Sequence, residues 1–265
     1  MSPTALIDHA ADKGLVAIAL TDHDTTSGVE EAIKRGEQRG IEVIPGIEIS
    51  AVYQDKSLHI LGYGGRQNNP TLCQRIKQVQ EARTQRNKGI IAKLNQLDIN
   101  LDFSTLKRDE GKQAGRPHIA RLLLNHGIVR SIDEAFIRFL KKGSPAYVAR
   151  EVFPAQEAIR IIIESGGIPV LAHPASIDPS FKILPDIISE LKSVGLAGLE
   201  VYYPSHTSKA CKTLLAIAKK QKMLITGGSD FHGTIKPDII LGQGYKKNQI
   251  PYELLENMKK YFHPN

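Results

Sequence analysis

The stretch L-V-A-I-A-L-T-D-H-D, residues 15–24, decides the fold class of this chain. Its first six residues form a continuous apolar run, which is typical of a strand covered on both faces of a parallel sheet. Ligand-type side chains follow directly at Asp22, His23 and Asp24. In parallel α/β folds the active site lies at the carboxyl ends of the strands. This stretch therefore predicts an α/β fold with a site at its strand ends.

The sequence around this stretch alternates between predicted helices and predicted strands. Helices are expected at residues 5–13 and 27–39, and the second ends at Gly40, a residue type favoured just past a helix end. Strands are expected at residues 15–20, 41–45, 52–63, 167–172, 197–202 and 223–226. Strands that alternate with helices indicate βαβ units and a parallel sheet.

Four more predicted strands deliver His, Asp or Glu towards the same edge of the sheet. These residues are Glu48 after 41–45, His59 within 52–63, His173 after 167–172, and Asp230 and His232 after 223–226. Imidazole and carboxylate together suit Zn²⁺, Mn²⁺ or Fe²⁺ better than Mg²⁺ or Ca²⁺, which prefer oxygen alone. A glutamate among several histidines can also bridge two ions, and clustered metals activate a bound water and clamp a phosphate.

Taken alone, each of these residues has a simpler structural explanation. Asp22 or Asp24 can cap the helix that follows, since aspartate is a good N-cap. His59 can be a satisfied interior histidine, His173 a turn residue and Glu48 a surface residue at a strand edge. The joint pattern favours a metal site, because a random scatter would not bring ligand-type side chains to five strands of one sheet.

The sequence changes character between residues 66 and 148, where it becomes helical and basic. We therefore expect three segments: a first part of the α/β domain at 1–66, a helical insertion at 67–147, and a second part at 148–265. An apolar helical stripe in the insertion predicts Arg83 and Arg86 on its buried face; the stripe comprises Leu72, Ile76, Val79, Ile90, Leu94 and Leu97.

Two buried arginines require an explanation, because arginine is rarely buried unless it is paired. Arginine also binds phosphate through two parallel hydrogen bonds. We expect one or both of Arg83 and Arg86 to turn towards the active-site mouth; the alternative is that they reach solvent or pair with acidic residues.

The motif G-R-P-H-I-A-R at residues 115–121 is a second candidate for phosphate contact. Its proline is favoured at the first helical position, which places Arg116 and His118 at a helix N-terminus. Helix N-termini attract anions through their free N–H groups. Arg116 and His118 are therefore candidate substrate contacts, with ordinary capping and packing as the alternative.

The composition sets broader limits. The formal net charge of +7 over 265 residues favours an anionic partner such as a phosphorylated metabolite or a nucleic acid. Two distant cysteines, Cys73 and Cys211, argue against a disulfide framework or a thiolate zinc site. No signal peptide and no membrane-spanning run is recognised in the sequence, so a cytoplasmic location without membrane association is expected. The oligomeric state is left open.

Five motifs of the chain resemble those of the PHP family of metal-dependent phosphoesterases. They are T-D-H-D-T-T-S-G (21–28), P-G-I-E-I-S (45–50), H-I-L-G-Y (59–63), L-A-H-P (171–174) and G-G-S-D-F-H-G (227–233). Three further segments resemble the branch of nucleoside 3′,5′-bisphosphate phosphatases and bacterial 5′-to-3′ exoribonucleases, namely the motif at 115–121, K-G-S-P-A-Y-V (142–148) and L-E-V-Y-Y-P-S-H (199–206).

The resemblance implies a distorted (β/α)₇ barrel with a helical insertion and up to three divalent metal ions. Mn²⁺ is expected first, with Fe²⁺, Zn²⁺ or Mg²⁺ as alternatives. The implied role of Glu48 is to bridge metals, with His59 and His173 on one shared ion. The implied metal ligands are His23, Glu48, His59, His173, Asp230 and His232, while Asp22 is expected to orient a ligand.

The implied activity is hydrolysis of phosphate from 3′,5′-bisphosphonucleotides, or 5′-to-3′ cleavage of short RNA, by a metal-bound hydroxide. A phosphorylated nucleotide or an RNA 5′ end is thus the expected partner. The candidate catalytic residues are Glu48, His118 and His206, where a protonated His206 or His118 assists the leaving oxygen. The candidate substrate-binding residues are Arg83, Arg86, Arg116, His118 and Ser205. The sequence contains neither a P-loop pattern nor a G-x-S-x-G elbow.

One feature of the family pattern is missing. The family begins with a strand that carries Asp-x-His-x-His, followed by a Ser-Asp-Gly turn that supplies another aspartate. Residues 1–4 of this chain align just after that turn, and no His-x-His occurs. The resemblance therefore implies a barrel without its first strand, through a misassigned start, a truncated chain or real loss. At least one ion is expected to bind poorly if the strand is truly absent. The alternatives kept are a histidinol-phosphate type of PHP phosphatase and a catalytically impaired binding module.

Overall fold

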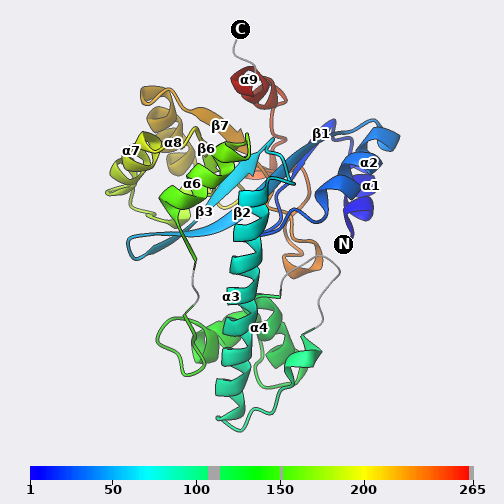
Figure 1. Cartoon of the computed structure of the whole chain (residues 1–265), viewed down its shortest axis with the longest axis vertical. Coiled ribbons are helices and arrows are strands. Elements are labelled where there is room, and N and C mark those ends of the chain that lie inside the picture. The colour runs from blue at the N-terminus through cyan, green and yellow to red at the C-terminus, as the bar shows by residue number, and fades with distance from the viewer. Residues whose placement is uncertain (107–113, 150–151, 263–265) are drawn as a thin grey trace. The chain divides into compact units, whose positions relative to one another are not determined.

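The computed structural model describes residues 1–106, 114–149 and 152–262 (Figure 1). The chain divides into two compact units, one formed by Met1–Cys73 with Phe153–Asn265 and the other by Gln74–Val152. Within the described residues, no helix combines the length and apolar character needed to cross a bilayer.

The first unit is built on a mixed sheet in the order β1-β2-β3-β5-β6-β7, with the short β4 paired to β2. The strands are β1 (Ala17–Leu20), β2 (Glu42–Tyr53), β3 (Lys56–Tyr63), β4 (Phe153–Pro154), β5 (Ile168–Leu171), β6 (Gly198–Tyr202) and β7 (Leu224–Gly227). β3 runs antiparallel to both β2 and β5, and the other pairings are parallel. The predicted α/β class is confirmed, and the expectation of an all-parallel sheet is wrong at β3.

The antiparallel strand arises from a hairpin that the sequence pattern did not reveal. Residues 52–63 were expected to form one strand, but the chain turns at Gln54 and Asp55, and Tyr53 pairs with Lys56 across the turn. Gln54 adopts a positive φ of 53° without the glycine or asparagine that usually marks such a turn. As a consequence, Glu48 lies in the middle of a long β2 and not beyond the end of a short strand.

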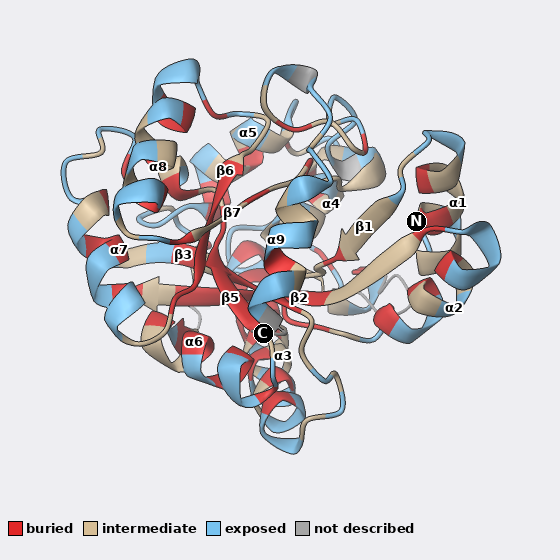
Figure 2. Ribbon diagram, turned by 90° about the horizontal axis from the view of Figure 1, so that it is seen from above, coloured by how far each residue is buried: buried red, intermediate tan, exposed pale blue. Residues whose placement is uncertain are grey.

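Helices surround this sheet and expose their outer faces, as Figure 2 shows for the view from above. They are α1 (Pro3–Asp12), α2 (Val29–Arg39), α6 (Ala155–Glu164), α7 (Leu184–Ser193), α8 (Ser208–Lys220) and α9 (Glu253–Phe262). α2 ends at Gly40, which is left-handed with φ 67°, as predicted. Asp8 of α1 bonds to Arg35 of α2 at 2.6 Å and fixes this helix pair beside β1.

The hydrogen-bonded path of strands has β1 at one end and β7 at the other, and barrel closure remains a prediction. α9 connects elements from distant parts of this path. It packs against β7, and its Met258 is buried with Leu61 of β3 and Val170 of β5. Lys259 of α9 bonds to Glu42 at the start of β2 at 2.7 Å.

The second unit is helical and has a hydrophobic core of its own. Its helices include most of α3 (Pro70–Asn95), α4 (Arg116–Asn125) and α5 (Ile132–Ala135), the last continuing into a π-type turn at Phe136–Leu140. Ile90 and Leu94 of α3 pack with Ile119 and Leu123 of α4. Leu97, expected on the same apolar stripe, is 43% exposed because it lies past the end of α3.

Candidate metal centre

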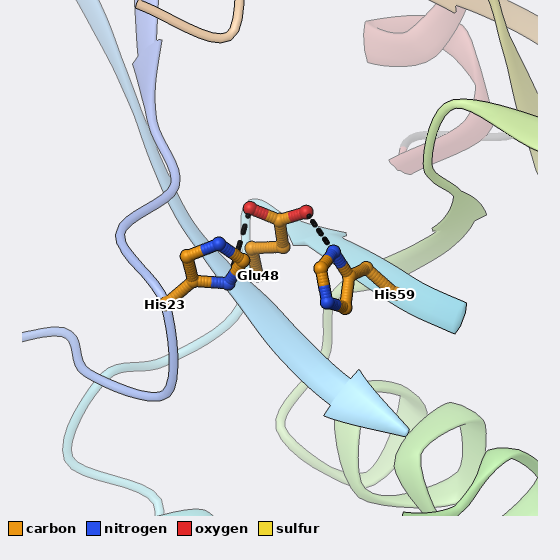
Figure 3. A group of neighbouring side chains, drawn as sticks. All are labelled: His23, Glu48 and His59. Atoms are coloured by element: carbon orange, nitrogen blue, oxygen red, sulfur yellow. Dashed lines mark ion pairs between the residues drawn. The ribbon is translucent and has the colours of Figure 1, made fainter. Parts of the chain in front are cut away.

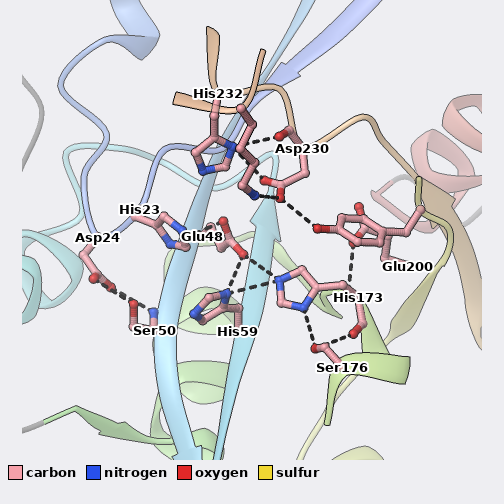
Figure 4. Close-up of polar contacts among 12 residues, drawn as sticks. His23, Asp24, Glu48, Ser50, His59, His173, Ser176, Glu200, Asp230 and His232 are labelled. Atoms are coloured by element: carbon pink, nitrogen blue, oxygen red, sulfur yellow. Dashed lines mark hydrogen bonds and ion pairs between the residues drawn. The ribbon is translucent and has the colours of Figure 1, made fainter. Parts of the chain in front are cut away.

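Glu48 lies between the imidazoles of His23 and His59 (Figure 3), and the imidazole of His173 approaches the same carboxylate (Figure 4). Its Oε1 is 2.8 Å from His59 Nδ1 and 3.2 Å from His173 Nε2, and its Oε2 is 3.3 Å from His23 Nδ1. The ligand atoms of His23, Glu48 and His59 all lie within 4.8 Å of one another. Four of the predicted ligands therefore meet in one place.

The β2–β3 hairpin explains why Glu48 and His59 share a face. Glu48 is paired with Leu61 and Ser50 with His59, so Glu48 and His59 are diagonal neighbours on one side of the antiparallel ladder. His23 joins them through an isolated parallel bridge to Glu48, supported by the backbone bond from Asp24 N–H to the Glu48 carbonyl at 2.9 Å.

Asp24 holds the loop that carries His23. Its carboxylate accepts hydrogen bonds from the backbone N–H of Ser50 at 2.9 Å and from the Ser50 hydroxyl at 3.0 Å. The N-cap of α2 is Gly28, so neither Asp22 nor Asp24 fills the capping role that was considered for them. Asp22 contributes its carbonyl, which accepts from the Glu48 N–H at 3.2 Å.

His173 follows β5 in a left-handed conformation with φ 31° and ψ 58°, which is costly for a residue with a side chain. The buried carboxylate of Glu200 on β6 accepts from the His173 N–H at 2.8 Å (Figure 4). The other ring nitrogen of His173 lies 3.0 Å from the Ser176 hydroxyl. These two contacts fix both the backbone and the ring of His173 so that Nε2 faces Glu48.

Asp230 and His232 form a second group beside the first. His232 Nδ1 donates to the Asp230 carbonyl at 2.7 Å, and its ring lies 6.2 Å from that of His23. The Asp230 carboxylate accepts from the Tyr203 hydroxyl at 3.0 Å and pairs with Lys236 at 2.7 Å. Asp230 is also left-handed, with φ 50°. Backbone strain of this kind gathers at functional sites.

Two carboxyl groups of the centre have displaced pKa values of opposite sign. Burial alone raises the pKa of Glu48, but the facing His23 and His59 and the hydrogen bonds from His173 and His59 outweigh it and hold the pKa well below 4.5. Burial raises the pKa of Glu200 to about 7 against the opposing effect of His173, and the Glu48 and Asp230 carboxylates add to the rise. Glu48 is therefore ionised at neutral pH.

The donor set fits a divalent transition-metal ion. Three imidazoles facing one ionised carboxylate are the ligand types that Zn²⁺, Mn²⁺ and Fe²⁺ share in proteins. The remaining ring nitrogens of His173 and His232 are held by a hydroxyl and a carbonyl, respectively. Metal-ligating histidines are usually held by partners of this kind.

His206 is buried, and its two ring nitrogens differ. Nδ1 donates to the Val201 carbonyl at 2.8 Å, which leaves Nε2 as the lone-pair atom of the neutral ring. Nε2 is buried without a hydrogen-bond partner. Burial lowers the pKa of His206, the bond to Val201 opposes this, and His173 adds to the lowering. Ser205 is exposed on the same loop.

The remaining candidates belong to the helical unit. Arg83 and Arg86 are buried on α3, as the helical stripe predicted, and Arg83 Nη1 would lie 3.4 Å from a Cβ placed on Gly115. His118 accepts from the Gly115 N–H at 3.1 Å and so caps the first turn of α4. Arg116 bonds to the Leu140 carbonyl at 3.4 Å. Their roles in substrate binding remain predictions.

Three residues of the centre were not anticipated, namely Glu200, Tyr203 and Lys236. Glu200 had a recognisable signal, because a glutamate between Leu199 and Val201 places a charge within a buried apolar strand. Tyr203 and Lys236 had no such signal, since exposed loops commonly carry both residue types. Their proximity to Asp230 depends on the course of two loops.

Comparisons with known proteins agree with this geometry. Residues 1–152 match the PHP domain family. The chain is 31% identical over 234 residues to a 3′,5′-nucleoside bisphosphate phosphatase of Chromobacterium violaceum, covering 88% of this chain and 82% of the relative. It is 32% identical over 232 residues to a 5′-3′ exoribonuclease of Haemophilus influenzae, covering 88% and 85%.

A solved structure supports the same conclusion. A candidate metal-dependent phosphoesterase of Bifidobacterium adolescentis superposes with a TM-score of 0.85 at 30% identity, covering 97% of this chain and 90% of that chain. The family match, the relatives and the shared fold agree with the cluster of histidines around Glu48. This chain belongs to the PHP family.

Proposed function

We propose that this protein is a metal-dependent phosphoesterase that acts on 3′,5′-bisphosphonucleotides or on the 5′ ends of short RNA. The observation that carries the proposal is the convergence of His23, His59 and His173 on the two oxygens of Glu48. The names of the relatives support the substrate class, since one is a nucleoside bisphosphate phosphatase and another an exoribonuclease.

In this proposal Glu48 would be the shared ligand of the divalent ions, and His59, His173 and His23 would hold them together with it. Asp230 and His232 extend the ligand set towards His23. Divalent ions, when bound here, would lower the pKa of a bound water and neutralise charge on the phosphoryl group. We expect Mn²⁺ first, with Fe²⁺, Zn²⁺ or Mg²⁺ as alternatives.

Side chains of the protein would position these ions and neutralise part of their charge. Glu48 remains ionised at neutral pH because the surrounding imidazoles stabilise its charge. Glu200 fixes the strained backbone of His173. His206, whose neutral ring keeps a lone pair on Nε2, would accept a proton or a hydrogen bond more readily than donate one. We keep Arg116, His118, Arg83, Arg86 and Ser205 as proposed substrate contacts.

The proposal is tested by product release from 3′,5′-bisphosphoadenosine and from a short 5′-phosphorylated RNA, each with Mn²⁺ and with a chelator. We expect metal-dependent release from at least one substrate and a loss of at least about 100-fold in Glu48→Gln, since the ion would lose its shared ligand. Asp55→Asn, an exposed carboxylate on the hairpin turn, is the matched control. A metal-loaded protein that cleaves neither substrate would contradict the proposal and favour a binding module.

A further inference from the structure

Lys236 contacts Asp230, one of the predicted metal ligands. It follows the short turn Gly233–Ile235, and its Nζ lies 2.7 Å from Oδ2 of Asp230. The same oxygen accepts from the Tyr203 hydroxyl at 3.0 Å. The other oxygen, Oδ1, lies 3.3 Å from His232 Nδ1. The ammonium group of Lys236 therefore contacts a carboxylate that we expect to bind a metal ion.

The contact is easily broken. The Lys236 side chain is 43% exposed, and an exposed ion pair is weak because water solvates the ammonium well when the pair opens. The Asp230 carboxylate is only 20% exposed and lies in a left-handed backbone position, so it is the more firmly fixed partner. If the pair opens, Lys236 moves and Asp230 stays.

The negative charge of the carboxyl groups in the centre explains why a lysine at this position is favourable. Asp230 and Glu48 both lie near the buried carboxyl group of Glu200, and like charges in one site destabilise each other. Lys236 offsets one of these charges. A divalent ion on Asp230 would take over that task and repel the ammonium at such short range.

We propose that Lys236 is an exchangeable counter-ion, which neutralises Asp230 before metal binding and contacts the phosphoryl oxygens of the substrate afterwards. The contact with the substrate rests on the proposed function. A lysine released from Asp230 remains within a side chain's length of anions held in the centre, and an ammonium binds phosphate as a point charge. Lys236 would thus couple loading of the centre to recognition of its anionic substrate.

The proposal predicts effects of opposite sign on two binding constants. In Lys236→Met we expect Mn²⁺ affinity to rise about two- to fivefold, because the competitor of an exposed ion pair is gone. Affinity of the metal-loaded protein for inorganic phosphate should fall about tenfold, because a charge-assisted hydrogen bond is lost. Lys34→Met is the matched control, since Lys34 forms an exposed pair with Glu30 on α2 and should change neither constant.

Both constants are measured by calorimetric titration of the whole chain, and neither requires turnover. A fall in both would show that Lys236 only holds the loop in place, and no change in either would show that it is an ordinary surface lysine; each result overturns the proposal. A rise in metal affinity with unchanged phosphate binding overturns the part of the proposal in which Lys236 contacts the substrate's phosphoryl oxygens. A wild-type chain that takes up no Mn²⁺ overturns the metal centre and this inference together, whereas an absence of turnover alone affects only the proposed function.

Discussion

Glu48 and Glu200 show how two glutamates with the same chemistry take different roles. Glu48 faces His23, His59 and His173 and stays ionised, whereas Glu200 receives one backbone N–H in a buried position where its pKa rises to about 7. Glu48 is therefore suited to bind a cation, whereas Glu200 is suited to fix the backbone at His173.

The role of Glu200 can be tested by comparing two substitutions. Glu200→Gln keeps an oxygen that can accept from the His173 N–H, whereas Glu200→Ala leaves that strained N–H without its partner. We expect the alanine variant to lose about 10- to 100-fold in metal affinity, as is typical when a group that supports a ligand is removed. The glutamine variant should retain most of the affinity.

Metal titration of both variants provides the measurement, and the melting temperature of the metal-free proteins serves as the control for folding. Equal losses of metal affinity in the two variants would argue that the charge of Glu200, and not its hydrogen bond to His173, is what matters.

At the scale of single residues, the sequence predicted the metal ligands better than it predicted the residues that contact and orient those ligands. His23, Glu48, His59 and His173 carry ligand atoms of unmistakable type, and short motifs place them beside apolar strands. Lys236 could not be found in the same way, because its contact with Asp230 depends on the path of a loop.

Among the elements, the β2–β3 hairpin has the largest effect on the site. Its close approach to β1 requires Gly46, because a Cβ at this position would lie 2.7 Å from Thr21 Cγ2, 3.0 Å from the Leu20 carbonyl and 3.1 Å from the Gly62 carbonyl. Two of these three atoms belong to the backbone and cannot move away easily.

We therefore expect Gly46→Ala to destabilise the protein by about 1–3 kcal/mol, as overpacking does. The same substitution at Gly89 should stabilise it by about 0.5–1 kcal/mol, because this glycine lies inside α3 and a Cβ would meet Val148 at an ordinary 3.4 Å. Urea unfolding of both variants measures the difference. A Gly46 variant as stable as the wild type would show that β1 and β2 have more room than the structure gives them.

The loop between β5 and α7 depends on Asp178. One carboxylate oxygen accepts from the backbone N–H and hydroxyl of Ser180, and the other from the N–H groups of Ile183 and Leu184 at the start of α7. The Ser180 hydroxyl bond, followed by these N–H bonds, lowers the pKa of Asp178 from 3.8 to about 2 despite partial desolvation.

This shift predicts a pH-dependent effect of Asp178→Asn. Because the folded pKa lies below the unfolded one, the stabilisation is complete above pH 3.8 and is lost as the pH falls towards 2. The variant should melt at a lower temperature than the wild type at neutral pH, and the gap should narrow in acid. Melting curves of both proteins between pH 2 and neutral pH test this prediction. A difference in melting temperature that stays constant with pH would exclude the charge of Asp178 as its cause.

The same elements show where sequence analysis of the fold succeeded and failed. Apolar runs located β1, β5, β6 and β7 to within a residue or two, since buried parallel strands are continuously apolar. The turn at Gln54 and Asp55 was missed because this pair lacks the glycine of the Asn-Gly or Asp-Gly pattern that marks a two-residue hairpin turn. The direction of β3 was missed with it.

At the scale of the whole molecule, a mixed sheet gathers ligands that are far apart in sequence. Glu48 and His173 are separated by 125 residues, and a helical unit with its own core lies between them in the chain. The net charge of +7 favours association with an anionic substrate, and the cluster of acidic and imidazole groups provides the place for cations.

The most direct measurement of this account is the number of divalent ions bound by the wild-type chain and by Glu48→Gln, determined by titration with Mn²⁺ and Zn²⁺ at neutral pH. We predict that the wild type binds at least one ion and that the variant loses at least about 100-fold in affinity while melting normally without metal. Equal uptake of metal by the two proteins would contradict the claim that the imidazoles around Glu48 form a metal centre.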